Sequence, residues 1–253
     1  LEKTIKICLK KKININYIIP VHIYGQLSDM RNINKIAKKF NLTVIEDCSQ
    51  SHGAKYIEDK SIKKNLSIFS LYPTKNLGAL GDAGIICTNN KRYYSKMKSL
   101  TEYGWQNRIC KDHKGINSRL DEIQASLLLY KLKSFDKNQT KRQSIAKKYF
   151  KIIKNVKIKL PSIRENTLHA FHLFVVEVNN RKKFINYLKK EKIGSSIHYI
   201  KPLHKHEGYT NILKFDELKN TENLCKKIVS LPLNDNLSLK DCLKIAHKIN
   251  EFK

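Results

Sequence analysis

The stretch FSLYPTKNLGALGDAG, residues 69–84, places one lysine and three glycines between two apolar runs. These runs, SIFSL (67–71) and AGIICT (83–88), have the length and composition of short β-strands. Lys75 therefore lies in a glycine-bearing loop between two predicted strands, where backbone N–H groups can approach a phosphate closely. The loop matches neither GxxxxGK[ST] nor GxGxxG, the common nucleotide-binding fingerprints. Taken alone, the loop is better explained as a glycine-bearing hairpin with an exposed lysine.

The sequence before this loop alternates strand-like and helical segments, which is typical of an α/β protein. ININYIIPVHIYG (13–25) and LTVIEDC (42–48) are predicted strands. Residues 28–41 have helical spacing, and Ser28 is a candidate N-cap. Short strands separated by helices and loops predict a largely parallel sheet, in which ligand sites lie at the carboxyl ends of the strands.

The second half of the chain predicts a long helix followed by a small α+β lobe. Helical spacing continues from about residue 120 to residue 153, with a weak polar break at 138–140. The last third has strand-like segments at 169–178 and 195–200, with helical segments around them. The predicted domains are residues 1–138 and 139–253.

The composition limits the kinds of protein this chain can be. Its 253 residues are 41% hydrophobic, which is ordinary for a globular protein and sufficient for a substantial core. No apolar run approaches the roughly 20 residues that span a bilayer, and the N-terminus lacks the apolar segment of a signal peptide. Six cysteines are spread widely without a CxxC pair, which argues against a zinc ribbon, an iron–sulfur site or a disulfide scaffold. We expect a cytoplasmic chain with free thiols, no metal and no membrane association.

The net charge of +28 raises the question of a nucleic-acid partner. Only seven of the fifty basic residues are arginine, the usual reader of bases and phosphates, and the lysines are spread along the whole chain. We find no interleaved aromatic and basic motif of the kind that stacks single strands. The charge therefore indicates a surface rich in lysine rather than a specific nucleic-acid site. Binding to nucleic acid that falls steeply with salt would support the alternative.

A second candidate lies in IEDCSQSHG (45–53), at the end of a predicted strand. Asp47 places a carboxylate where α/β ligand clefts form, although an aspartate here, with Gln50 three residues later, also fits the start of a helix. Asp47 and Lys75 follow neighbouring strands of one predicted sheet and can therefore face one cleft. A Schiff-base lysine needs an aldehyde cofactor, and pyridoxal 5′-phosphate (PLP) needs a carboxylate at its pyridinium nitrogen. Together the two residues fit PLP chemistry.

Seven segments spread along essentially the whole chain carry a family resemblance. They are VHIYGQLSDM (21–30), IEDCSQSHGAKY (45–56), FSLYPTKNLGALGDAGIICT (69–88), EYGW (102–105), INSRLDEIQAS (116–126), IHYIKPLH (197–204) and LPLNDNLS (231–238). In this order they resemble the DegT/StrS-type sugar aminotransferases, PLP enzymes that aminate nucleotide-linked keto-sugars. The resemblance implies the PLP-transferase type I fold, with a large domain built on a mainly parallel sheet and a small C-terminal α+β domain.

The resemblance also implies roles for individual residues. Lys75 matches the lysine that forms the internal aldimine with PLP and then moves the proton between cofactor and substrate. Asp47 matches the carboxylate that keeps the pyridine nitrogen protonated, Gln50 the residue beside the phenolic oxygen, and Ser70 a phosphate-binding hydroxyl. Asn117 matches an asparagine that reaches the phosphate in the partner subunit's site. A homodimer with shared active sites is therefore implied.

The substrate and the reaction are also implied by the resemblance. His198, Tyr199 and His204 fall in a segment that lies near the substrate, although packing within the small lobe explains them nearly as well. Lysine at position 75, where related sugar dehydratases carry histidine, favours transamination. The resemblance therefore implies transfer of an amino group, with glutamate as the expected donor, to a nucleotide-linked keto-sugar in surface-polysaccharide synthesis.

The chain departs from the family at its front. Family members open with a longer segment that supplies the first strands of the large domain, a phosphate contact and an aromatic residue that stacks on the cofactor. Residues 1–16 contain no counterpart of it. We therefore expect an incomplete large domain whose activity depends on the missing segment. The alternative is a non-catalytic or inactive fragment that only pairs with other chains.

Overall fold

The computed structural model describes residues 1–57, 65–209 and 218–253. Contacts divide the chain into unit 1 (Leu1–Asp136 with Arg164–Ala170) and unit 2 (Lys137–Ile163 with Phe171–Lys253). The sequence-based domains, 1–138 and 139–253, remain a prediction about folding units. The short segment 164–170 packs with unit 1, although its neighbours in sequence on both sides pack with unit 2.

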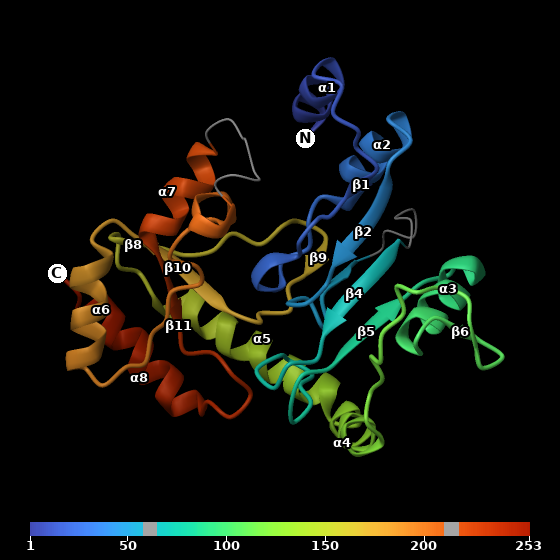
Figure 1. The fold of residues 1–253 in the computed structure, drawn as a ribbon. Coiled ribbons are helices and arrows are strands. Elements are labelled where there is room, and N and C mark those ends of the chain that lie inside the picture. Colours follow the sequence, from blue (N-terminus) through green and yellow to red (C-terminus); the bar gives the residue numbers. More distant parts are fainter. Residues whose placement is uncertain (58–64, 210–217) are drawn as a thin grey trace. The chain divides into compact units, whose positions relative to one another are not determined.

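Unit 1 is built on a four-stranded sheet with the order β1-β2-β4-β5. Its strands are β1 (Tyr17–Ile18), β2 (Thr43–Asp47), β4 (Leu66–Ser70) and β5 (Gly84–Cys87). Strands β1, β2 and β4 are parallel, and β5 pairs with β4 in the antiparallel direction (Figure 1). The expected mainly parallel sheet is confirmed, and the antiparallel strand lies at its edge.

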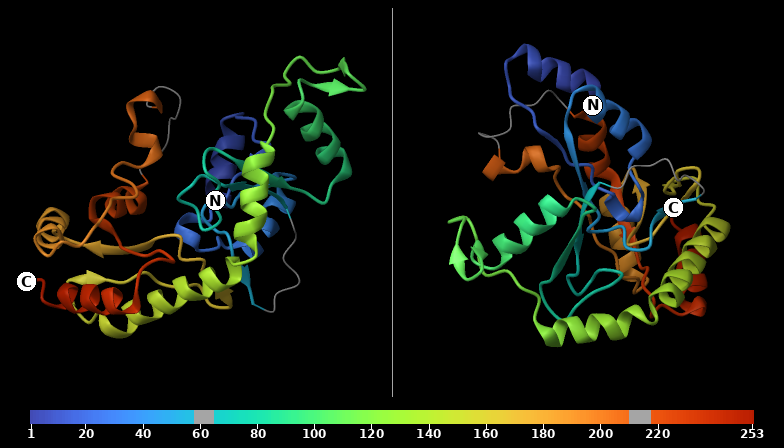
Figure 2. Two further views of the ribbon diagram at one scale, coloured as in Figure 1. Left: turned by 90° about the horizontal axis from the view of Figure 1, so that it is seen from below. Right: turned by 90° about the vertical axis from the view of Figure 1, so that its right-hand side faces the viewer.

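Helices and two short strand pairs complete unit 1. The helices are α1 (Glu2–Lys10), α2 (Met30–Lys39), α3 (Lys91–Thr101) and α4 (Glu122–Leu132), with the 3-10 turn η1 (Ile23–Gly25). Strand β3 (Lys55–Tyr56) pairs with β9 (Thr167–Leu168), and β6 (Trp105–Gln106) pairs with β7 (Ile109–Cys110). Figure 2 shows the β6–β7 hairpin next to α3. No helix among the described residues is long and apolar enough to cross a membrane.

The chain around β1 and α2 differs from the expectation in two details. The predicted strand 13–25 is reduced to β1 and a separate parallel bridge between Val21 and Asp47. Pro20, which has no N–H to give to a ladder, lies between them, and its carbonyl accepts the Asp47 N–H at 2.9 Å. The N-cap of α2 is Asp29, whose carboxylate accepts the Asn32 N–H, rather than Ser28. The Ser28 hydroxyl instead donates to the Val21 carbonyl.

Unit 2 packs helices against a three-stranded antiparallel sheet with the order β11-β10-β8. Its strands are β8 (Ile158–Lys159), β10 (Phe174–Val178) and β11 (Ile228–Leu231). Its helices are α5 (Phe135–Ile152), α6 (Arg181–Lys190), α7 (Lys219–Lys227) and α8 (Leu239–Asn250), with the 3-10 turns η2 (Leu203–Lys205) and η3 (Glu207–Tyr209). Phe174 lies in the core, with its ring 5.0 Å from that of Tyr149 and 5.2 Å from that of Phe150. The expected α+β lobe is confirmed.

Two expected elements of the second half differ in the structure. The single long helix is two helices, α4 and α5, and they separate at residues 133–134 rather than at 138–140. The helix continues through 138–140, where Gln139 is buried, and in the next turn the buried Arg142 pairs with Asp235 at 3.3 Å. The predicted strand 195–200 is limited to one bridge, between Ser196 and Ser230.

The start of α8 offers a test of local stability. The Ser238 hydroxyl oxygen accepts the Asp241 N–H at 3.0 Å, and the hydroxyl also donates to the Asp241 carboxylate at 2.6 Å. We expect Ser238→Ala to lower the free energy of unfolding of unit 2 by about 1 kcal/mol, because the first turn of the helix loses its cap. Urea denaturation followed by circular dichroism measures this change. The control is Ser196→Ala, which alters a serine that bridges through its backbone and should have a smaller effect.

Candidate active site

Lys75 lies in the loop between β4 and β5, and this loop is folded tightly on itself. The Lys75 N–H donates to the Tyr72 carbonyl at 2.9 Å. A Cβ atom at position 78 would lie 2.5 Å from the Pro73 carbonyl oxygen, so only glycine fits there. The compact loop fixes the backbone from which the Lys75 side chain projects.

Helix α4 fastens the glycine-bearing half of this loop. The Gln124 side-chain oxygen accepts the N–H groups of Leu80 and Gly81, each at 3.0 Å. Lys131 donates to the Gly78 carbonyl at 2.6 Å. Sequence reasoning missed Gln124 as part of the site. Its only signal was its place in the matched segment 116–126, because helical spacing says nothing about a loop distant in sequence.

Asp47 ends β2 and acts electrostatically on Lys75. Partial burial lowers the pKa of Lys75 below its ordinary value, while the negative charge of Asp47 works in the opposite direction and raises it. The amine and the carboxylate therefore face a common region, as expected from the parallel strands that carry them. The residues after Asp47 form turns rather than a helix, and its carboxylate accepts the Ser49 N–H at 2.9 Å. The helix-start interpretation of Asp47 is therefore wrong.

Gln50 and Ser70 lie on the segments that carry Asp47 and Lys75. Gln50 is buried, and its side-chain oxygen accepts the Tyr24 N–H at 2.6 Å. Ser70 is the last residue of β4, and its hydroxyl oxygen accepts the Tyr72 N–H at 3.4 Å. Because β2 and β4 are parallel neighbours, their carboxyl ends lie at the same edge of the sheet. A carboxylate, an amine, an amide and a hydroxyl are thus gathered at that edge.

His52 is a buried residue of this region that sequence reasoning did not single out. Its ring lies 5.4 Å from that of Phe69 at an interplanar angle of 63°. Neither ring nitrogen has a hydrogen-bond partner among the described residues. Burial, and to a lesser extent the positive charge of Lys75, lower the pKa of His52 to about 4; the Ser70 backbone acts in the opposite direction without reaching hydrogen-bond geometry. The imidazole is therefore neutral near pH 7.

The low pKa of His52 predicts a dependence of stability on pH. A histidine that stays neutral when folded binds fewer protons than in the unfolded chain, so its contribution is lost as the pH falls from about 6.5 toward 4. We expect His52→Leu to make the free energy of unfolding fall less steeply over this range. Urea denaturation at a series of pH values measures the slope. His113→Leu, at an exposed position, is the control and should leave it unchanged.

Asn117 is not brought to this cluster by the contacts of the described residues. Its side chain is exposed, and its carbonyl oxygen accepts from the Arg119 guanidinium at 3.0 Å. Its backbone forms an isolated bridge with Glu102. The expected role of Asn117, contact with the phosphate in the partner subunit's site, therefore stays a proposal.

His198, Tyr199 and His204 belong to unit 2. His198 shares a hydrogen bond of 2.8 Å with the Ser230 hydroxyl, and burial lowers the pKa of His198. Tyr199 is 48% exposed. His204 lies 2.9 Å from the Glu222 carboxylate. Both histidine contacts lie within unit 2, and a place for the three residues near the substrate stays a proposal.

A cavity of about 550 Å³ in unit 1 is lined by His22, Glu46 and Cys48, whose potential ligand atoms all lie within 4.8 Å of one another. Glu46 and Asp47 are adjacent in β2 and therefore point to opposite faces of the sheet. The Ser28 N–H donates to His22 Nδ1 at 3.0 Å, so Nε2 carries the ring proton and donates it to Glu46 at 2.8 Å. A metal on Nε2 would have to displace this proton while Nδ1 still faces a donor. The cluster is therefore a hydrogen-bonded pair rather than a metal site.

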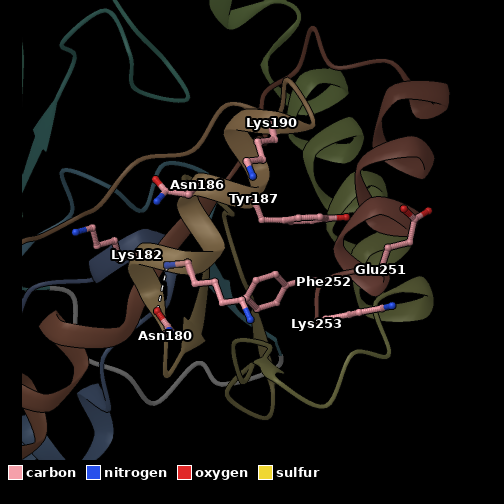
Figure 3. A pocket seen from close by; sticks show the side chains of 9 residues that line it. Asn180, Lys182, Asn186, Tyr187, Lys190, Glu251, Phe252 and Lys253 are labelled. Carbon is pink, nitrogen blue, oxygen red and sulfur yellow. Dashed lines mark hydrogen bonds between the residues drawn. The ribbon is translucent and has the colours of Figure 1, made fainter.

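Unit 2 has a cavity of about 630 Å³ between α6 and the C-terminus (Figure 3). Tyr187 and Phe252 line it with rings 5.4 Å apart, and Lys182, Lys190 and Lys253 lie around them. These lysines are in keeping with a lysine-rich sequence. The lining includes none of the residues expected to contact a cofactor or substrate.

Comparison with protein families gives a match over nearly the whole chain. The model of the DegT/DnrJ/EryC1/StrS aminotransferase family matches residues 4–250. The chain belongs to this family. The resemblance found in the sequence segments is therefore confirmed.

A curated relative supports the assignment over a similar length. The dTDP-3-amino-3,6-dideoxy-alpha-D-galactopyranose transaminase of Aneurinibacillus thermoaerophilus is 40% identical over 252 residues, covering 93% of this chain. The match covers 65% of that relative, so the chain spans slightly less than two thirds of its length.

Solved structures confirm the fold. S. venezuelae DesV, determined in complex with a ketimine intermediate, superposes with a TM-score of 0.89 at 30% identity, covering 96% of this chain and 67% of DesV. NtdA from Bacillus subtilis, with bound cofactor PMP, superposes with a TM-score of 0.83 at 28% identity, covering 94% of this chain and 56% of NtdA. The family is PLP-dependent, in agreement with the expected cofactor. The carboxylate, the half-buried amine and the hydroxyl at the ends of β2 and β4 fit this cofactor.

Proposed function

We propose that this chain carries the PLP site of a sugar aminotransferase, with Lys75 as the residue that bonds to the cofactor. The observation that supports this most directly is that Asp47, at the carboxyl end of β2, acts electrostatically on the half-buried amine of Lys75. Burial lowers the pKa of the Lys75 amine, so more of it is unprotonated and nucleophilic near neutral pH. A surface lysine in a hairpin would have neither the burial nor the carboxylate.

Each residue of the cluster has a distinct task in this proposal. Bound PLP supplies an electron sink for the charge left on a substrate carbon when a proton is removed. Asp47 holds the ring nitrogen in its protonated form, and Ser70 with the N–H groups of the loop binds the phosphate. Gln50, held by the Tyr24 N–H, contacts the phenolic oxygen. Lys75 Nζ, once released from the cofactor, accepts a proton from one carbon and returns it to another.

The proposed substrate is a nucleotide-linked keto-sugar, and glutamate is the proposed amino donor. The name of the Aneurinibacillus relative, a dTDP-sugar transaminase, supports this class of substrate. The net charge of +28 would attract a sugar diphosphate at low ionic strength. Tyr199, with His198 and His204, is proposed to lie near the sugar. A homodimer in the cytoplasm, with Asn117 reaching the partner's phosphate site, completes the proposal for a role in polysaccharide synthesis.

Spectroscopy tests the proposed function. The purified chain is mixed with PLP, and visible absorbance is followed before and after glutamate is added. We expect a visible band from the bond to lysine, loss of that band with glutamate, and release of 2-oxoglutarate. A band that glutamate does not change would support the alternative, a chain that holds the cofactor or pairs with other chains without catalysis. The absence of any band would contradict the proposal.

A further inference from the structure

Segment 164–170 contacts two loops of unit 1 that carry site residues. Its strand β9 pairs with β3, and its start is held by Arg164, which lies 3.6 Å from the Asp29 carboxylate. At its end, the Ala170 N–H donates to the Gly25 carbonyl at 2.9 Å. The Ala170 carbonyl accepts from the Asn76 side-chain amide at 3.0 Å. Ala170 therefore uses both of its backbone polar groups to join the loop at Gly25 to the loop at Asn76.

These two loops lead directly to the proposed cofactor contacts. Gly25 follows Tyr24, whose N–H holds the Gln50 side chain at 2.6 Å. Asn76 follows Lys75. The hydrogen bonds thus form a continuous connection from Gln50, through Ala170, to the residue next to Lys75. It links two loops that follow different strands of the sheet, β2 and β4.

The two halves of the Lys75 loop have different anchors. Gln124 and Lys131 of α4 hold the half that contains the glycines, at positions 78–81. Asn76 is the side chain that ties the lysine half to another segment through a hydrogen bond that bridges 94 positions of sequence. The Lys75 N–H also donates to the Tyr72 carbonyl, which fixes the turn itself, whereas the Asn76 bond fixes the lysine half against segment 164–170.

We propose that Asn76 is a positioning residue, whose hydrogen bond to the Ala170 carbonyl holds the Lys75 amine in its half-buried place beside Asp47. The functional importance of this position rests on the proposed function. The position of the amine itself does not require a bound cofactor. Two effects act on the pKa of the Lys75 amine: burial lowers it, and the carboxylate of Asp47 raises it. A change in the position of the amine therefore changes its exposure and its distance from one negative charge.

Reductive methylation of the full chain, without PLP, measures the position of the amine. Formaldehyde with cyanoborohydride is applied at a series of pH values, and peptide mass spectrometry follows Lys75 beside exposed lysines. In the wild type we expect Lys75 to react at lower pH than exposed lysines, because burial lowers its pKa. In Asn76→Ala we expect the Lys75 profile to shift toward that of exposed lysines, with a fall of about threefold or more in its rate at pH 8.

The control is Asn155→Ala, which removes another half-buried asparagine amide that donates to backbone carbonyls, at 2.9 Å and 2.8 Å, in unit 2. It should lower stability and leave the Lys75 profile unchanged. If Asn76→Ala does not fold, Asn76→Ser, whose side chain is too short for the bond, takes its place with the same expectations. A Lys75 profile in the variant that matches the wild type, or a wild-type profile that matches exposed lysines, would overturn the proposal. Failure of the chain to bind PLP would contradict the proposed function but not the positioning role of Asn76.

Discussion

Lys75→Ala is expected to abolish the visible band that forms when PLP is added, and with it all transfer of the amino group. Alanine has no amine to bond to the cofactor aldehyde and leaves the position of Nζ near Asp47 without one. The tight turn at Tyr72 and Gly78 depends on backbone groups, so the variant should fold as the wild type does. Absorbance spectra and the release of 2-oxoglutarate measure the two losses.

The control for this variant is Lys98→Ala, which removes an exposed lysine paired with Glu102 at 2.6 Å. It should retain the visible band at full intensity, because surface lysines react with aldehydes only weakly and without a defined site. A band that persists in Lys75→Ala, at an intensity equal to that of the wild type, would show that the amine resides elsewhere. Circular dichroism confirms that both variants are folded.

Asp47→Asn is expected to weaken PLP binding by roughly 10- to 150-fold, the equivalent of about 1.5–3 kcal/mol for a hydrogen bond to a charged group. Asparagine keeps the shape and the oxygen that accepts the Ser49 N–H, but it lacks the charge that holds the pyridinium proton. Equilibrium titration followed by absorbance measures the affinity. Asp121→Asn is the control, since Asp121 makes no side-chain cap hydrogen bond at the start of α4.

The same substitution that weakens PLP binding is expected to make the Lys75 amine more reactive, and this difference separates the two roles of Asp47. The carboxylate raises the pKa of Lys75, so its removal should lower that pKa and increase the unprotonated fraction. Lys75 in Asp47→Asn should therefore react faster with formaldehyde at neutral pH while binding PLP more weakly. A variant that binds PLP as tightly as the wild type would contradict the role of Asp47 at the ring nitrogen.

The sheet and the central residue pair could be predicted from sequence because they depend on local patterns. Apolar runs bounded by Asp47 on one strand and by the Lys75 loop on the next place both side chains at one edge once the strands are parallel. Neighbouring parallel strands leave little freedom in that placement. The antiparallel direction of β5 agrees with the hairpin interpretation of the Lys75 loop, but the apolar pattern alone did not decide it, since a strand of four residues has the same pattern in either direction.

Features that depend on long-range contacts could not be predicted. The break was expected at the polar stretch 138–140, but the helix runs through it, and Arg142 just beyond it is buried against a carboxylate 93 positions away. Asn76, whose partner is 94 positions distant, resembles any polar loop residue in the sequence. His52 gave no signal either, since its significance lies in burial without a hydrogen-bond partner. The roles of Gln50, Ser70 and Asn117 came from the family resemblance and remain proposals.

Borohydride reduction in the presence of PLP, followed by peptide mass spectrometry, tests the central claim most directly. Reduction fixes the cofactor permanently to whichever amine holds it, and the chain offers many competing lysines. The account predicts that, at one equivalent of PLP, the label is found on the peptide that contains Lys75. Label spread over exposed lysines, or absent from Lys75, would contradict it.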